Sequence, residues 1–354
     1  MEKQAIKIGH VETKSVMTKS NAPLGGFSVN PYVGCPHACK YCYASFMKRF
    51  TGHTEDWGTF MDVKHWPAIA NPRKYAGQKV IIGTVTDGYN PLEEQFGKTR
   101  LLLEQLKDSG ADILICTKSD LVLRDMDLLM EINRKNRLTV SWSVNTLDEA
   151  FKDDMDAAVS IERRLAAMKQ VYDAGIRTVC FISPVFPGLT DIEAIFERTK
   201  DQCDLMWLEN LNLRGGFKKT IMDYIAEKHP DLMPLYDEIY NKKNRAYFEA
   251  LEKQAEEMAR KNGCRFVDNE TPYERVPKGH PTIVDYFYHE EVRGTANSGK
   301  RNTARYKPGN RFFRPVSLLP LAAMGLMSTS GSFCITRMRF RLRSPQGSLL
   351  TASS

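Results

Sequence analysis

The chain has 354 residues, of which 42% are hydrophobic and 26% are charged, as in an ordinary globular protein that folds as one barrel-sized domain or two smaller ones. No stretch approaches the roughly 20 apolar residues of a membrane-spanning helix, and the polar stretch MEKQAIKIGH has no apolar run of the length found in signal peptides. We therefore expect a cytoplasmic protein that has reduced thiols and does not enter a membrane.

The formal net charge of +7 is concentrated at the C-terminal end. Residues 311–354 contain six arginines and no Asp, Glu or Lys, whereas residues 1–310 carry 44 basic and 43 acidic side chains. A body with a net charge of +1 does not by itself indicate nucleic-acid binding. We interpret 311–354 as an atypical basic tail, either a natural extension or a non-native, disordered C-terminus translated out of frame.

Short apolar runs alternate with amphipathic stretches along the chain. The predicted strands are 28–33, 79–85, 111–117, 138–144, 177–183 and 204–210, and the predicted helices include 98–110, 161–175 and 236–262. Gly110 and Gly175 stand where helix C-caps are expected. This alternation predicts an α/β fold with a parallel sheet, a partial (β/α)6 TIM-like barrel with chemistry at the carboxyl ends of its strands.

We divide the chain accordingly into four parts. Residues 1–27 form an N-terminal lead-in, 28–215 the partial barrel, 216–310 a C-terminal helical or mixed extension, and 311–354 the basic tail.

The stretch GCPHACKYCYA places Cys35, Cys39 and Cys42 in the loop after the first predicted strand. A structural zinc site normally has four protein ligands, and His37 would reach such a site only awkwardly from inside this short loop. A ferredoxin-type cluster also uses four cysteines. Three thiolates on a four-iron cluster would instead leave one iron open to a substrate. The zinc site and a chance cluster of cysteines are the alternatives to this interpretation.

The Cys-x₃-Cys-x₂-Cys spacing, with an aromatic residue before the last cysteine, resembles the signature of the radical S-adenosylmethionine (radical SAM) superfamily. The stretches YCYA, GTVTDGYNPLE, TKSD, SVNT and PVFPGLTD are similar to the branch of spore photoproduct lyase and the DNA repair photolyases. Within it, NPYVGCPHACKYCYASFMKRFTGH most resembles the radical SAM mobile pair protein B group. The resemblance covers roughly residues 1–310.

This resemblance implies a partial barrel of the radical SAM type with two cofactors, a [4Fe-4S] cluster and S-adenosylmethionine. Cys35, Cys39 and Cys42 would ligate the cluster. The implied S-adenosylmethionine contacts are Tyr41 on the adenine, Thr86 and Asp87 near the methionine amino group, Lys118 on the carboxylate, and Ser143. Tyr41 and Tyr43 would be the catalytic residues that relay a hydrogen atom.

Each of these assignments has a simpler alternative. TDGYNP is rich in turn formers, so Thr86 and Asp87 fit an ordinary turn. Lys118 and Ser143 fit polar strand ends, and Tyr43 fits core packing. Cys116 and Cys180 lie in apolar runs and read as buried small hydrophobic residues.

The resemblance implies an enzyme that cleaves S-adenosylmethionine reductively and abstracts hydrogen from its substrate. The candidate substrates are nucleic acid, as for a photolyase-like lyase, or a protein, peptide or partner-supplied molecule. Thr84 best matches the position of the cysteine hydrogen donor of spore photoproduct lyase, which argues against the same repair reaction. A flavodoxin- or ferredoxin-type electron donor and a partner radical SAM protein are the expected partners. The non-enzymatic alternative is a metal-stabilised nucleic-acid-binding protein.

Overall fold

The computed structural model describes residues 5–20, 26–267 and 282–287. All of them fall within one compact unit, Met1–Val316. The predicted basic tail at 311–354 lies outside the described residues. None of the described helices is both long and apolar enough to cross a bilayer.

The described elements alternate between strands and helices, as the sequence pattern predicts. The strands are β1 (Lys7–Glu12), β2 (Met17–Lys19), β3 (Phe27–Val29), β4 (Tyr32–Val33), β5 (Phe60–His65), β6 (Lys79–Ile82), β7 (Asp112–Thr117), β8 (Arg137–Ser143), β9 (Arg177–Val185), β10 (Leu205–Asn210), β11 (Arg265–Phe266) and β12 (Ile283–Phe287). The α-helices are α1 (Glu93–Phe96), α2 (Lys98–Leu106), α3 (Met126–Lys135), α4 (Glu149–Met155), α5 (Ile161–Asp173), α6 (Ile192–Thr199), α7 (Gly216–Lys228), α8 (Met233–Tyr240) and α9 (Ala246–Lys261). The 3₁₀ helices are η1 (Tyr43–Phe50), η2 (Pro72–Tyr75), η3 (Leu121–Asp125) and η4 (Pro230–Leu232).

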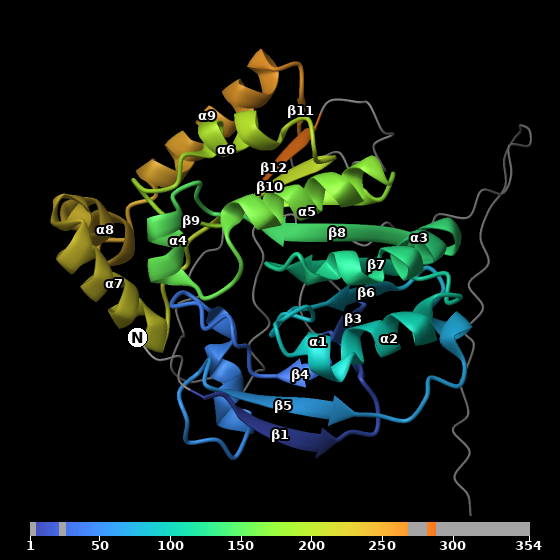
Figure 1. Ribbon diagram of the computed structural model, residues 1–354. Coiled ribbons are helices and arrows are strands. Elements are labelled where there is room, and N and C mark those ends of the chain that lie inside the picture. The colour runs from blue at the N-terminus through green and yellow to red at the C-terminus, as the bar shows by residue number, and fades with distance from the viewer. Residues whose placement is uncertain (1–4, 21–25, 268–281, 288–354) are drawn as a thin grey trace, which may run out of the picture. The chain divides into compact units, whose positions relative to one another are not determined.

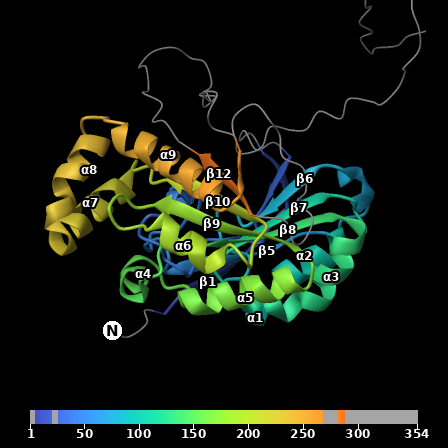
Figure 2. The same cartoon turned by 90° about the horizontal axis from the view of Figure 1, so that it is seen from above.

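The main sheet has nine described strands in the order β11-β12-β10-β9-β8-β7-β6-β3-β2 (Figure 1). Every neighbouring pair is parallel except β2 with β3. Helices α2, α3 and α5 lie along one face of this curved sheet (Figure 2). The parallel order brings the loops that follow the strands to one edge, which confirms the predicted partial barrel. Because β11 and β12 belong to the same sheet, it continues beyond the predicted limit at residue 215.

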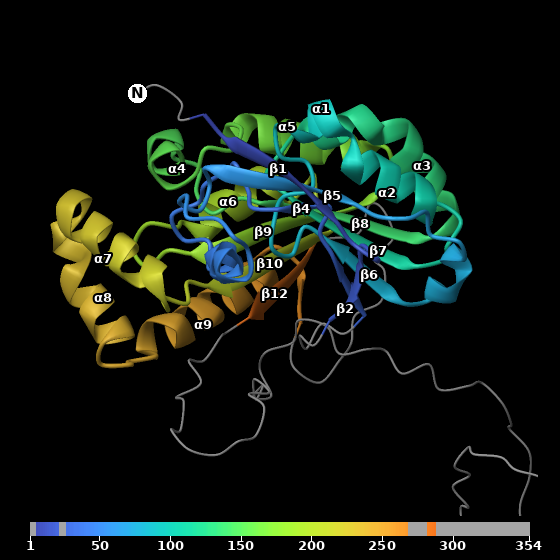
Figure 3. The same ribbon diagram turned by 90° about the horizontal axis from the view of Figure 1, so that it is seen from below.

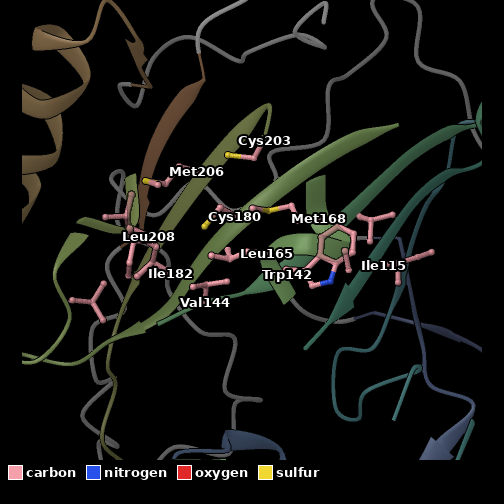
Figure 4. Packing of buried hydrophobic residues seen from close by; sticks show 14 of the residues in the cluster. Ile115, Trp142, Val144, Leu165, Met168, Cys180, Ile182, Cys203, Met206 and Leu208 are labelled. Atoms are coloured by element: carbon pink, nitrogen blue, oxygen red, sulfur yellow. The ribbon is translucent and has the colours of Figure 1, made fainter. Parts of the chain in front are cut away.

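The helix-facing side of the sheet is the main core. Trp142, Cys180 and Met206 point from β8, β9 and β10 toward Leu165 and Met168 of α5 (Figure 4). Each large apolar side chain buried in this way contributes about 1.5–3 kcal/mol to folding. The full burial of Cys180 confirms its prediction as a small core residue.

The other, inner side of the sheet carries a separate apolar cluster at its base. Ile81, Leu114, Val179, Leu205 and Ile283 alternate along their strands with the helix-facing residues. The base is therefore closed by side chains, and polar groups gather above it.

A second sheet of three described strands, in the order β1-β5-β4, lies beside η1 in the view from below (Figure 3). The predicted first strand at 28–33 was one element, but the structure divides it between the two sheets. Pro31 lies at the division and has no amide N–H to continue a ladder. The chain then enters the cysteine loop directly from β4.

The predicted helix at 236–262 is wrong as one element, because α8 ends at Tyr240 and α9 begins at Ala246. Lys243, between them, adopts a left-handed backbone with φ of 61°. The Asn244 side chain accepts a hydrogen bond from the Ala246 amide at 3.0 Å, which favours a new helix start there. By contrast, Gly175 has φ of 79° and directly follows the C-cap of α5, as the sequence predicts. The prediction for Gly110 is wrong, because α2 already ends at Leu106 and Gly110, with φ of 71°, lies in the turn before β7.

Candidate active site

The three clustered cysteines lie in the loop between β4 and η1, and all three are free thiols. Cys35 is buried, whereas Cys39 and Cys42 are partly exposed. Burial raises the pKa of each thiol, and it raises that of Cys39 to about 12. Negative charge on Cys39 and Cys42 would raise the pKa of Cys35 further. Thiols with raised pKa are protonated on their own, but a bound metal deprotonates coordinating thiols outright.

Within the described residues, no three His, Cys, Asp or Glu side chains converge closely enough to bind a single metal ion. The three cysteines nevertheless share one short loop between β4 and η1. A donor set of three neighbouring thiols, two of them partly exposed, fits a sulfur-ligated cluster that has an open side.

Close backbone packing sets the shape of the cysteine loop. Gly34 enters it with φ of 90°, and a Cβ there would lie 2.4 Å from the Phe60 carbonyl oxygen. Within the loop, the Ala38 amide donates to the Cys35 carbonyl at 3.2 Å and the Cys42 amide to the Cys39 carbonyl at 3.1 Å. The cysteines therefore lie on successive tight turns.

His37, within this loop, forms a buried pair with Asp87. The Nε2 atom of His37 lies 3.0 Å from Asp87 Oδ2, so the possible zinc ligand faces a carboxylate. Asp87 also accepts hydrogen bonds from the Lys118 amide at 2.7 Å, the Tyr89 amide at 2.8 Å and the Thr117 hydroxyl at 2.9 Å. Burial would raise the pKa of Asp87, but the charge of His37 and these donors hold it below its usual value.

The predicted contacts Thr86 and Asp87 are thus both turned toward the cysteine loop. The Thr86 hydroxyl donates to the Gly34 carbonyl at 2.6 Å. Both side chains are buried and already hydrogen-bonded within the protein. Their hydrogen bonds stabilise the cysteine loop, and their contact with a ligand stays a prediction.

Tyr41, Lys118 and Ser143, which come from three different loops or strand ends, meet around a buried ion pair. The Tyr41 hydroxyl donates to Asp156 at 3.1 Å, and the Lys118 ammonium lies 5.7 Å from the centre of the Tyr41 ring. Arg164 donates to Asp156 at 2.7 Å and to the Ser143 carbonyl at 3.2 Å. Three of the predicted cofactor contacts are therefore brought together.

Sequence reasoning missed Asp156 and Arg164, both of which are buried. A signal for Arg164 exists, because it interrupts the apolar face of α5 formed by Ile161, Leu165 and Met168. A charge on such a face indicates a buried ionic partner. No local pattern marks Asp156.

Tyr43 begins η1 and reaches the loop after β6. Its hydroxyl donates to the Thr84 carbonyl, and Glu209 and Cys116 are electrostatic neighbours of its side chain. The Thr84 hydroxyl contacts the Ser28 hydroxyl and accepts from Asn30 at 2.9 Å. Tyr43 therefore lies against the inner wall of the barrel.

The prediction of Cys116 as a buried core residue is wrong, because its side chain is partly exposed and faces the inner side of the sheet. Its register partner on β8 is Ser141, whose hydroxyl is buried and has no hydrogen-bond partner among the described residues. The inner wall thus carries polar groups close to the cysteine loop.

The sequence of this chain matches a known protein family and is similar to known proteins. Residues 29–198 match the family described as the radical SAM superfamily. An uncharacterised protein of Methanocaldococcus jannaschii, MJ0683, is 34% identical over 238 residues, which are 67% of this chain and 88% of that protein. An uncharacterised protein of Mycobacterium tuberculosis, Rv2578c, is 27% identical over 229 residues, which are 61% of this chain and 67% of that protein.

Two solved structures are also similar. Spore photoproduct lyase complexed with dinucleoside spore photoproduct superposes with a TM-score of 0.47 at 13% identity, covering 63% of this chain and 67% of that one. Streptococcus suis SuiB bound to S-adenosylmethionine gives a TM-score of 0.39 at 14% identity, covering 57% of this chain and 48% of that one.

Proposed function

Because the chain belongs to the radical SAM superfamily, and is an enzyme of that class, we propose that Cys35, Cys39 and Cys42 hold a [4Fe-4S] cluster. When bound, this cluster supplies the electron that cleaves S-adenosylmethionine, and the resulting 5′-deoxyadenosyl radical abstracts hydrogen from the substrate. The observation that carries the proposal is the loop of three neighbouring thiols at the carboxyl edge of the parallel sheet.

The residues around this loop are suited to bind a zwitterionic nucleoside ligand. Lys118 has no carboxylate within salt-bridge distance among the described residues, and we assign it to the methionine carboxylate. Tyr41 would lie against the adenine, and Ser143 would hydrogen-bond the same ligand. Thr86 and Asp87 would stabilise the conformation of the cysteine loop on the side where the methionine amino group would bind.

Tyr41 and Tyr43 are the two candidate hydrogen-atom relays. The Tyr41 hydroxyl is committed to the buried Asp156 carboxylate. Tyr43 is about half exposed and borders the inner wall near Cys116. The geometry therefore favours Tyr43 for contact with a substrate, and we assign Tyr41 to contact with the cofactor.

The surface of η1 favours nucleic acid as the substrate. Phe46 and Phe50 are 41% and 67% exposed, and the Arg49 guanidinium lies 5.4 Å and 4.6 Å from the centres of their rings. Exposed aromatic rings beside arginine are a platform on which unpaired bases stack. This platform begins directly after Cys42, so a bound strand would be delivered to the cysteine loop.

The proposed chemistry is tested by anaerobic reconstitution with iron and sulfide, followed by measurement of 5′-deoxyadenosine. We expect brown protein with about four iron atoms per chain and nucleoside formation when a reductant of the flavodoxin or ferredoxin type is added. Cys39→Ala should lose both, whereas the matched control Cys264→Ala, which removes a partly exposed thiol outside the loop, should lose neither. A fully loaded, active Cys39→Ala variant would contradict the proposal.

The proposed substrate class is tested by the anisotropy of a labelled single-stranded oligonucleotide. Phe50→Ala should weaken its binding about tenfold, because one stacked base contributes about 1–3 kcal/mol. Met130→Ala, which truncates an exposed apolar residue on α3, should have no effect. Equal binding by both variants would favour the alternative of a protein, peptide or partner-supplied substrate.

A further inference from the structure

Strands β9 and β10 pair irregularly at their carboxyl ends. Between the register pairs on either side, β9 has two residues, Ser183 and Pro184, where β10 has one, Glu209. The Ser183 hydroxyl donates a hydrogen bond to Oε2 of Glu209 at 2.5 Å. An extra residue of this kind forms a β-bulge, and bulges re-aim side chains next to active sites. The bulge and the hydrogen bond from Ser183 together fix the Glu209 carboxylate.

The Glu209 side chain lies on the inner side of the sheet. Leu205 and Trp207, which precede it on β10, belong to the inner apolar cluster, and alternate residues of a strand share a face. Trp207 is buried, whereas Glu209 is partly exposed. The carboxylate is also an electrostatic neighbour of Tyr43, which directly follows the last cysteine of the loop. Glu209 thus stands at the carboxyl edge of the inner wall, where solvent reaches it.

A second polar side chain on this inner wall lacks a partner. The Ser141 hydroxyl, on β8, is buried and has no hydrogen-bond partner among the residues that the structure describes. A buried hydroxyl of this kind costs free energy unless a ligand or an ordered water completes it. The wall that carries Glu209 therefore has hydrogen-bonding capacity that the described protein groups do not use.

The charge of Glu209 limits which chemical groups can approach it. An ionised carboxylate has about four lone-pair sites, so Glu209 can accept a further hydrogen bond in addition to the one from Ser183. It repels phosphate groups, because they carry negative charge. The cation of the aromatic platform, Arg49, lies instead on η1. This arrangement favours a nucleic-acid strand whose backbone stays near η1 and whose base faces Glu209.

We propose that Glu209 determines substrate specificity by accepting a hydrogen bond from the amino group of a nucleobase. This inference rests on the proposed function, in which single-stranded nucleic acid is the substrate. Acidic side chains accept from the N4 amino group of cytosine, whereas thymine presents a carbonyl oxygen at the same ring position. The site should therefore prefer cytosine to thymine, which is a pyrimidine of similar size.

The test compares the affinities of the reconstituted protein for labelled oligodeoxycytidine and oligothymidine of equal length, measured by fluorescence anisotropy. We expect a preference of about tenfold for the cytosine strand. Glu209→Met keeps the length of the side chain but removes the acceptor, and it should abolish this preference. The control is Glu227→Met, because Glu227 is 75% exposed on α7 and its loss should leave the preference unchanged. A folded Glu209→Met protein that retains the preference, or a wild-type protein that binds both strands equally, would overturn the inference.

A second measurement on the wild-type protein covers the case in which Glu209→Met fails to fold. Replacing each cytosine by pyrimidin-2-one removes the amino group and leaves the ring in place, and this strand should bind about tenfold more weakly than oligodeoxycytidine. Equal binding of these two strands would overturn the role of Glu209 but leave the proposed function intact. A wild-type protein that binds neither oligodeoxycytidine nor oligothymidine would instead contradict nucleic acid as the proposed substrate.

Discussion

Two buried clusters of charged side chains differ in how completely their members are paired. In the first, Arg124 donates to Glu93 at 2.8 Å and to Asp125 at 2.8 Å, and both carboxylates are fully buried. Arg100 donates to Asp125 at 2.9 Å, and the Tyr32 hydroxyl donates to Glu93. Each carboxylate in this cluster has several partners within the protein.

The second cluster surrounds the cysteine loop and is less completely paired. Asp87 and Asp156 are satisfied, but His37 Nδ1 is buried without a partner among the described residues. The Lys118 ammonium lies 5.7 Å from the centre of the Tyr41 ring, and no carboxylate of the described residues lies within salt-bridge distance of it. The first cluster is fully paired within the protein, whereas the second has polar groups that the proposed ligand would use.

The largest expected effect concerns the buried pair of the second cluster. Arg164→Met leaves Asp156 without its main partner and should lower the free energy of unfolding by about 3–5 kcal/mol. The adjacent Arg163 pairs with Asp120 on the surface, so Arg163→Met should cost at most about 1 kcal/mol. Urea unfolding of both variants provides the measurement, and equal losses would contradict the assignment.

A smaller effect separates the two clusters directly. Lys118→Met should weaken S-adenosylmethionine binding to the reconstituted protein about tenfold, or about 1.4 kcal/mol, because the ligand carboxylate loses its cation. Glu93→Gln, in the first cluster, should lower stability and leave this affinity unchanged. Calorimetric titration distinguishes them, and a loss of affinity in Glu93→Gln alone would reverse the roles of the two clusters.

The smallest effect concerns His53, in the loop before strand β5 of the second sheet. His53 lies 3.0 Å from Asp62 and 2.9 Å from Glu55; burial would lower its pKa, but these two carboxylates outweigh burial and raise the pKa. This stabilisation is full below the unfolded-state pKa of about 6.5 and is lost as pH rises through the raised folded-state pKa. The stability difference between wild type and His53→Gln should therefore shrink as pH rises above about 6.5. A difference that grows with pH would contradict this prediction.

Much of the main sheet could be predicted because its signals are local. Apolar runs bounded by turn residues mark β6 to β10, and Gly175 marks the end of α5. The second sheet and strand β12 could not be predicted, because their partners are distant: β1 pairs with β5, and β12 pairs with β10. The break between α8 and α9 was missed because the polar residues there also fit an exposed helix face.

In the candidate site, too, local features could be predicted and contacts between distant residues could not. The spacing of Cys35, Cys39 and Cys42 is a local signal, and the three cysteines lie in one loop between β4 and η1. The pairing of His37 with Asp87 joins residues 50 positions apart, and the hydrogen bond from Tyr41 to Asp156 joins residues 115 positions apart. Such contacts follow from tertiary packing, which no periodicity in the sequence encodes.

The most direct test of the central claim is Mössbauer spectroscopy of protein reconstituted with ⁵⁷Fe, with and without S-adenosylmethionine. The account predicts a [4Fe-4S] cluster in which one iron, lacking a protein thiolate, changes its isomer shift when S-adenosylmethionine is added. A cluster whose irons are all unaffected by S-adenosylmethionine, or a protein that binds zinc in preference to iron, would contradict it.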